Sequence, residues 1–172
     1  MNTGVAKDAL DLGKRLQDEA SKLWAPPTEG FNSQSEMVLL GSIVKGTRGY
    51  IEKIVNQING TYENGWYDAC SVMIRRLVET LIVEAFEYYK IDNQIKNSSD
   101  DFLYLNDLIS RTLSSTQWNL SRNTKRALPK LKDIGDKSAH SRRFIAHRGD
   151  IDKIVPELRV VAQEFVYLAN LK

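Results

Sequence analysis

The chain has 172 residues, of which 42% are hydrophobic and 27% charged, and its formal net charge is +2. This balance is typical of one ordinary soluble globular domain with room for a tail, and it excludes the fibrous and low-complexity classes. No apolar run is long enough to span a membrane, and the N-terminus lacks the apolar core of a signal peptide, so we expect a cytoplasmic protein without a membrane partner.

The first element in chain order is predicted to be a helix over residues 4–23, where apolar side chains recur at helical spacing. The stretch WAPPTEGFNSQ (24–34) then breaks the pattern with two prolines and a glycine, which is typical of a linker. We therefore expect an N-terminal helical arm with its linker over 1–34 and a domain over 35–172. The arm is expected to dock on the domain or to swap onto a partner chain.

The domain is predicted to begin with two helices. In SEMVLLGSIVKGTRG (35–49), periodicity cannot separate helix from strand, and we favour a short helix capped by Ser35. From Tyr50 onward, apolar residues recur three and four positions apart. This spacing predicts a helix that is ended by Gly60 and Gly65.

The clearest element is WYDACSVMIRRLVETLIVEAFEYYK (66–90). Its broad apolar face predicts a helix at the centre of a bundle. The single cysteine, Cys70, lies on that face, and we interpret it as a small buried hydrophobe rather than a reactive thiol. One cysteine also excludes an internal disulfide and a zinc cluster built from several thiolates.

Three more helices are predicted before the last one. Ser99 or Asp100 is expected to cap a helix that runs through Ile109. The stretch 115–140 is interpreted as two helices, with Pro129 in the first turn of the second.

The last helix is predicted to begin near Asp150 and to be kinked at Pro156. No stretch of the sequence has the period-two pattern of a strand, and there is no internal repeat. The predicted fold class is therefore all-α, an up-and-down bundle of four to six helices with the N-terminal arm.

Positive charge is concentrated in one segment. Residues 122–148 hold nine Lys or Arg and two Asp, so the remainder of the chain is net negative. A basic face on a nearly neutral protein is expected of a surface that binds anions or nucleic acid. A solvated face, or one that pairs with the acidic helix over 78–87, explains the pattern equally well.

Both histidines, His140 and His147, lie in or beside this basic segment. Neither belongs to a paired metal-ligand motif, and the chain has no phosphate-binding glycine loop and no dinucleotide fingerprint, so we expect no metal and no cofactor. Ser138 and Ser141 flank His140, which makes a nucleophilic triad formally possible. Serines next to a histidine arise readily by chance, so this hypothesis is weak.

Arg142 and His147 have the spacing Arg-x-x-x-x-His. Arginine binds a phosphate through two parallel donors, and histidine can take a proton from a ribose 2′-hydroxyl or give one to the leaving oxygen. The pair, aided by His140, is therefore the candidate catalytic site for cleaving RNA without a metal ion. The candidate nucleic-acid-binding residues beside it are Lys137, Arg143 and Arg148.

A structural role for part of this segment competes with catalysis. Arg75 and Arg76 lie four and three positions before Glu79, so either can pair with it on one helical face. Asp136 and His140 are the natural partners for this polar face inside the bundle. The resulting network would hold the last loop in place.

Three stretches carry a resemblance to known proteins: CSVMIRRLVETLIVEAFEYY, LPKLKDIGDKSAHSRRF and DIDKIVPELRVVAQEFVYLANLK. They resemble a bacterial family of helical domains of unknown function, which is similar to the HEPN superfamily. The resemblance covers residues 48–172, and GDKSAHSRRF is its most specific part. It implies an up-and-down bundle of four or five helices that is often a homodimer.

Many members of that superfamily are RNases of toxin or phage-defence systems, in which Arg-x(4–6)-His loops meet across the dimer interface. By this resemblance, Arg142 would bind phosphate and His147 would act as acid and base. The motif of the resembling family centres on His140, however, and other superfamily members are non-catalytic adaptors. Two functions therefore stay open, an RNA-associated RNase and an adaptor or dimerisation domain that binds a protein partner.

Overall fold

The structure is a computed structural model that describes residues 11–16 and 36–172. Contacts divide the chain into two units, Met1–Phe31 and Asn32–Lys172. In the first unit, residues 11–16 are helical, and the rest of the helix expected over 4–23 lies outside the described residues. The N-terminal arm and the boundary expected after residue 34 stay predictions.

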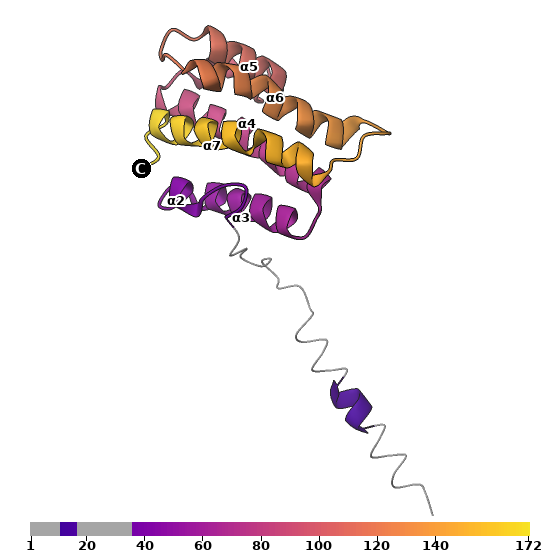
Figure 1. Cartoon of the computed structure of the whole chain (residues 1–172). Coiled ribbons are helices and arrows are strands. Elements are labelled where there is room, and N and C mark those ends of the chain that lie inside the picture. The colour runs from indigo at the N-terminus through magenta and orange to yellow at the C-terminus, as the bar shows by residue number, and fades with distance from the viewer. Residues whose placement is uncertain (1–10, 17–35) are drawn as a thin grey trace, which may run out of the picture. The chain divides into compact units, whose positions relative to one another are not determined.

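Residues 36–172 form a helical bundle, which confirms the predicted all-α class (Figure 1). The long helices run in alternating directions along the bundle, as the course of the ribbon in Figure 1 shows. Within the described residues no strand forms, and the only β-type pairing is one isolated bridge. The helices are α2 (Gly41–Val44), α3 (Gly49–Glu63), α4 (Tyr67–Tyr88), the 3-10 turn η1 (Asp92–Ile95), α5 (Leu105–Ser114), α6 (Arg122–His140) and α7 (Arg148–Leu168).

The central element is α4, which packs against α3, α6 and α7, as its broad apolar face predicts. Ile74, Leu77 and Leu81 lie on that face and are fully buried. Cys70 is also fully buried, with its thiol near the carbonyl oxygen of Ile58, so its interpretation as a core residue is confirmed. Burial raises the pKa of the Cys70 thiol to about 12, although a hydrogen bond with Thr61 opposes the shift.

The backbones of α4 and α6 approach closely at Gly135. A Cβ atom at this position would lie 2.5 Å from Cβ of Arg75 and 3.0 Å from the carbonyl oxygen of Ser71. No side chain other than hydrogen fits that space, so a glycine is needed for the contact. The approach also places the next residue, Asp136, beside Arg75.

The segment before α2 is not helical, although a helix capped by Ser35 was expected there. Asn59, buried on α3, accepts hydrogen bonds from the N–H groups of Val38 (3.2 Å) and Leu39 (3.0 Å) and donates to the carbonyl of Leu39 (2.8 Å). These bonds satisfy backbone groups that would otherwise form a helical turn. The helix therefore begins only at Gly41, and Ser35 lies outside the described residues.

The end of α3 was predicted at Gly60 and Gly65, and only the second position is correct. The helix continues through Gly60 to Glu63. Gly65 then takes a φ of +75°, and the next residue, Trp66, donates its N–H to the carbonyl of Thr61 at 2.8 Å. This is the left-handed glycine that commonly ends a helix.

The start of α5 was predicted at Ser99 or Asp100, and this is wrong because α5 begins at Leu105. The side-chain oxygen of Asn97 accepts from the N–H groups of Ser99 (2.8 Å) and Asp101 (3.0 Å). A side chain that accepts hydrogen bonds from nearby backbone N–H groups in this way competes with helix formation.

The two helices predicted over 115–140 are a single helix, α6, which begins after Ser121. The hydroxyl of Ser121 accepts from the N–H of Thr124 at 3.2 Å and caps the helix. Pro129 lies inside α6 and is exposed, so water can reach the carbonyl that loses its hydrogen bond. In α7, which starts two residues before the predicted Asp150, the helix runs through Pro156 without a break.

Candidate functional site

The connection between α6 and α7, residues 141–147, lies at one end of the bundle beside the turn from α3 to α4 (Figure 1). The N–H of Ala146 donates to the Asp68 carboxylate at 3.0 Å, which ties the connection to the start of α4. The N–H of His147 donates to the Asp150 carboxylate at 3.0 Å. Because α4 and α7 both hold it, the connection presents its side chains from a fixed backbone.

We define the basic end as residues 137–148. This stretch holds four Lys or Arg, both histidines of the chain, and no Asp or Glu. Every candidate catalytic or nucleic-acid-binding residue is exposed there, so each side chain is accessible to a ligand. These residues are Lys137, His140, Arg142, Arg143, His147 and Arg148.

Two cations of the basic end already have acidic partners. The Lys137 ammonium lies 2.7 Å from the Asp133 carboxylate. Arg148 donates its Nε–H to the hydroxyl of Tyr62 at 3.0 Å and lies 3.8 Å from the Asp152 carboxylate. These acidic partners lie on α6 and α7. In the described structure no ion pair joins the basic segment 122–148 to the acidic stretch 78–87 of α4, so the alternative in which those two segments pair is not supported.

Arg142 and Arg143 differ from these cations. Neither guanidinium has an ion pair or a hydrogen bond with any residue that the structure describes. The hydroxyl of Ser141 accepts from the backbone N–H of Phe144 at 3.2 Å, which bends the chain tightly around the two arginines. Their positive charge is therefore available to an anion.

The contact between Arg148 and Tyr62 also positions the start of α7. Tyr62 is buried on α3, and its hydroxyl donates to the Asp152 carboxylate. Burial, followed by this hydrogen bond, raises the pKa of Tyr62, so the phenol keeps its proton at neutral pH. The Nε of Arg148 is thereby occupied, and the guanidinium is anchored next to His147.

The polar face of α4 forms part of the expected network. Arg75 donates its Nε–H to Asp136 at 2.8 Å, and its Nη1 lies 3.4 Å from Glu79. The second Asp136 oxygen accepts from Lys132 at 2.5 Å. Arg75 and Lys132 each donate to one oxygen of Asp136, whereas His140 is exposed and makes no hydrogen bond with Asp136 in the described structure.

The electrostatics of Asp136 follow from this geometry. Partial burial alone raises the pKa of the carboxyl group. The hydrogen bonds from Lys132 and Arg75, together with their charges, outweigh the burial, so the pKa lies below its ordinary value. Sequence reasoning missed Lys132, although its position four residues before Asp136 was a usable signal.

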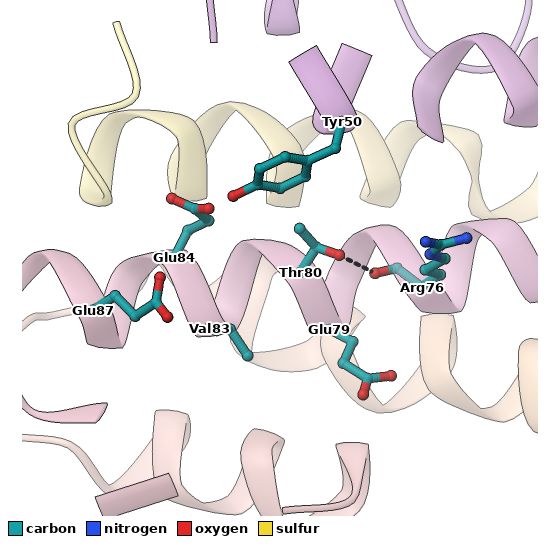
Figure 2. Close-up of a pocket in the computed structure, with 7 residues that line it drawn as sticks. All are labelled: Tyr50, Arg76, Glu79, Thr80, Val83, Glu84 and Glu87. Carbon is teal, nitrogen blue, oxygen red and sulfur yellow. Dashed lines mark hydrogen bonds between the residues drawn. The ribbon is translucent and has the colours of Figure 1, made fainter. Parts of the chain in front are cut away.

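Arg76, the remaining residue of the predicted network, lines a groove of about 460 Å³ on the outer face of α4 (Figure 2). The carboxylate of Glu84 is buried in this groove and lies 3.6 Å from Nε of Arg48. Burial raises the pKa of Glu84, and the charge of Arg48 opposes the shift. Because carboxylates line the groove, it does not suit a phosphate ligand. The groove is lined by Tyr50, Arg76, Glu79, Thr80, Val83, Glu84 and Glu87.

The hypothesis of a nucleophilic serine beside His140 has no geometric support in the described residues. Ser138 Oγ is buried without a hydrogen-bond partner, and Ser141 Oγ is engaged with the backbone of Phe144. No hydrogen bond joins either serine to His140, as an activated nucleophile would need.

The described ranges 11–16 and 36–172 contain no group of three or more His, Cys, Asp or Glu side chains placed to hold a metal ion. No helix in these ranges has the length and apolar character needed to cross a membrane.

Comparisons with known proteins identify no relative: no family model, no curated protein and no solved structure matches the chain. The HEPN resemblance therefore stays a prediction that rests on the quoted motifs.

Proposed function

We propose that this protein binds RNA at the basic end and cleaves it without a metal ion. The observation that supports this most is the pair of exposed guanidinium groups on Arg142 and Arg143, which have no acidic partner among the described residues. Arginine forms paired hydrogen bonds to phosphate, and phosphate contacts provide most of the affinity for nucleic acid.

The proposed cleavage uses the ribose 2′-hydroxyl as the nucleophile. Its oxygen attacks the adjacent phosphorus while His147 accepts the hydroxyl proton. The bond from phosphorus to the 5′-oxygen breaks, and His140 donates a proton to that leaving oxygen. Arg142 stabilises the charge that develops on the non-bridging oxygens. The products are a 2′,3′-cyclic phosphate and a free 5′-hydroxyl.

The experiment incubates the full chain with end-labelled RNA in EDTA over a range of salt concentrations. We expect metal-independent cleavage that is lost in His147→Ala and falls by roughly 100-fold or more in His140→Ala. The matched control is the double variant Arg122→Ala and Arg126→Ala, which removes two exposed charges at the other end of α6 and should cleave normally.

Binding is measured separately on RNA whose 2′-oxygens are methylated, because such RNA cannot be cleaved. Replacing Arg142 and Arg143 together with alanine should reduce the slope of log K against log salt by about 2. Intact RNA under every salt condition would exclude the cleavage, and a salt slope equal to that of the control would exclude the binding site.

A second candidate is a non-catalytic adaptor or dimerisation domain. The observation that favours it is that no neighbouring side chain hydrogen-bonds to either imidazole in the described structure. Catalytic histidines are usually oriented by such a bond. A non-catalytic adaptor role predicts that RNA stays intact and that His147→Ala does not change RNA binding.

Membership of a toxin or phage-defence system is part of the same proposal and rests on the HEPN resemblance. Expressing the chain in bacteria should then arrest growth, and His147→Ala should relieve the arrest. Equal growth with both forms, at equal protein levels, would remove this role.

A further inference from the structure

The turn between α3 and α4 exposes a large aromatic side chain. The indole of Trp66 is 63% exposed, whereas Trp118 packs against Phe86 in the core. The Trp66 backbone is fixed, because its N–H donates to Thr61 at 2.8 Å and its carbonyl accepts from Cys70 at 2.9 Å. An exposed indole on a fixed backbone is ready to bind a ligand with little loss of chain entropy.

Trp66 lies close to the basic end. Asp68, two residues further along the chain, is the residue that accepts from Ala146 at 3.0 Å. Two residues span at most about 8 Å of chain, so Trp66 and the 141–147 connection belong to the same end of the bundle. Figure 1 shows the turn between α3 and α4 at the end of the bundle where α6 passes into α7.

A second apolar side chain adjoins this surface. Ile145, next to Ala146, is 67% exposed, and Phe144 is half-buried beside it. The end of the bundle therefore combines unpaired guanidinium groups with an exposed ring and an exposed aliphatic group. A ligand that matches this combination carries negative charges and flat apolar faces at short intervals.

We infer that Trp66 stacks on an unpaired base of a nucleic-acid strand whose phosphates contact Arg142 and Arg143. The inference rests on the proposed function and adds that the surface selects single strands over duplexes. In a duplex, the faces of the bases are covered by their neighbours, so an indole outside the helix cannot stack on them. In a single strand, each base offers a face regardless of its identity.

The test measures binding by fluorescence anisotropy with the full chain. The probes are a short unstructured strand with 2′-O-methyl groups and the same strand annealed to its complement. We expect tighter binding to the single strand. Trp66→Ala should weaken that binding by roughly 5- to 100-fold and leave duplex binding and the salt slope unchanged. Trp66→Phe should retain most of the affinity, because it keeps a ring.

The matched control is Tyr167→Ala. Tyr167 is 88% exposed but lies near the far end of α7, so its removal should change neither affinity. Trp66 is exposed, so the melting temperature of Trp66→Ala should equal that of the natural chain.

The outcomes separate the two proposals. If Trp66→Ala binds the single strand as the natural chain does, while the Arg142 and Arg143 double variant is weakened, stacking is wrong and the proposed binding site stands. If the arginine variant also binds normally, the proposed site itself fails. If Trp66→Ala leaves binding intact but changes the mass of the protein in solution, the indole belongs to a contact between copies of the chain.

Discussion

At the scale of single residues, the contact between α4 and α6 depends on two adjacent residues of α6, Gly135 and Asp136, which contribute in different ways. Gly135 allows the backbones to approach, and Asp136 joins Arg75 and Lys132 across the gap. The pair explains why a glycine followed by an aspartate stands at this point of the sequence. The contact accounts for the first two residues of the motif GDKSAHSRRF by packing and ion pairing alone.

Gly135→Ala is expected to destabilise the fold by about 1–3 kcal/mol, because the new methyl group would overlap Cβ of Arg75 and force the helices apart. Urea denaturation measures the effect. The control is Gly149→Ala, in the first turn of α7, where a methyl group meets no atom within 4 Å. That variant should be neutral or more stable by up to about 1 kcal/mol. Equal stability of the two variants would contradict the close approach.

Asp136→Asn is expected to cost roughly 1–3 kcal/mol at neutral pH, because the carboxylate accepts charged hydrogen bonds from Arg75 and Lys132. The folded pKa of Asp136 lies below its ordinary value near 3.9, so this stabilisation is complete above about pH 5. It should be lost as the pH falls through the folded pKa.

Urea denaturation as a function of pH measures the difference in the free energy of unfolding between the natural chain and Asp136→Asn. Asp133→Asn serves as the control, because its ion pair with Lys137 is largely exposed and should contribute less than about 1 kcal/mol. A difference between Asp136→Asn and the natural chain that stays constant into strong acid would show that Asp136 acts by packing alone.

The candidate site residues could be predicted from the sequence only in part. Arg75, Glu79 and Asp136 come together as their spacing suggested, because helical periodicity places them on facing sides of α4 and α6. His140 does not join them, because it lies exposed at the end of α6 while Lys132 donates to Asp136. Lys132 and His140 each lie four residues from Asp136, so helical spacing makes both of them candidates and does not choose between them.

At the scale of helices, α6 is anchored at its start by α7. The Glu164 carboxylate accepts from the backbone N–H (2.6 Å) and hydroxyl (2.7 Å) of Ser121 and from the hydroxyl of Thr124, which is buried. This anchor lies at the opposite end of α6 from the basic end. It fixes the helix without occupying the candidate site.

Ser121→Ala is expected to cost about 1 kcal/mol of stability, the usual value for a lost N-cap. Because Glu164 shares the same hydrogen bonds, the costs of Ser121→Ala and Glu164→Gln should not add, with a coupling of at least about 0.5 kcal/mol. A double-mutant cycle by thermal denaturation measures the coupling. Additive costs would contradict the anchor. The proposed RNA cleavage, measured well below the melting temperature, should be unaffected in both single variants and in the double variant.

The accuracy of the predicted helices follows from what determines each end. The centre of α4 was predicted because a long apolar face dominates its packing. The starts of α2 and α5 were missed because single asparagine side chains, Asn59 and Asn97, bond the backbone before each helix. Pro129 misled the prediction for α6, because its exposed position inside a helix is tolerated at a cost that packing on α4 and α7 offsets.

At the scale of the whole molecule, charge is separated over the bundle. Unpaired cations gather at the basic end, and carboxylates line the groove on α4. Under the proposed function, this separation would steer a nucleic acid to one end of the bundle, and the effect should weaken as salt rises. The predicted all-α class follows from periodicity alone, whereas this distribution depends on which cations are neutralised by neighbours.

The homodimer implied by the HEPN resemblance is a prediction at this scale. Light scattering after size-exclusion chromatography should give twice the mass of one chain at micromolar concentration. His147→Ala should leave that mass unchanged, since the side chain is exposed and its removal leaves the backbone bond to Asp150 in place. The mass of one chain at every concentration tested would contradict the dimer and would confine the proposed chemistry to His140 and His147 of a single copy.

The burial of Cys70 between α3 and α4 makes it possible to measure, by thiol labelling, how readily these two helices separate. A thiol reagent can reach this sulfur only after α3 separates from α4, and the raised pKa leaves little thiolate before that happens. Labelling in native conditions should be slower than in urea by at least about a thousandfold. Since the chain has no other cysteine, the labelling rate reports how often this pair of helices opens.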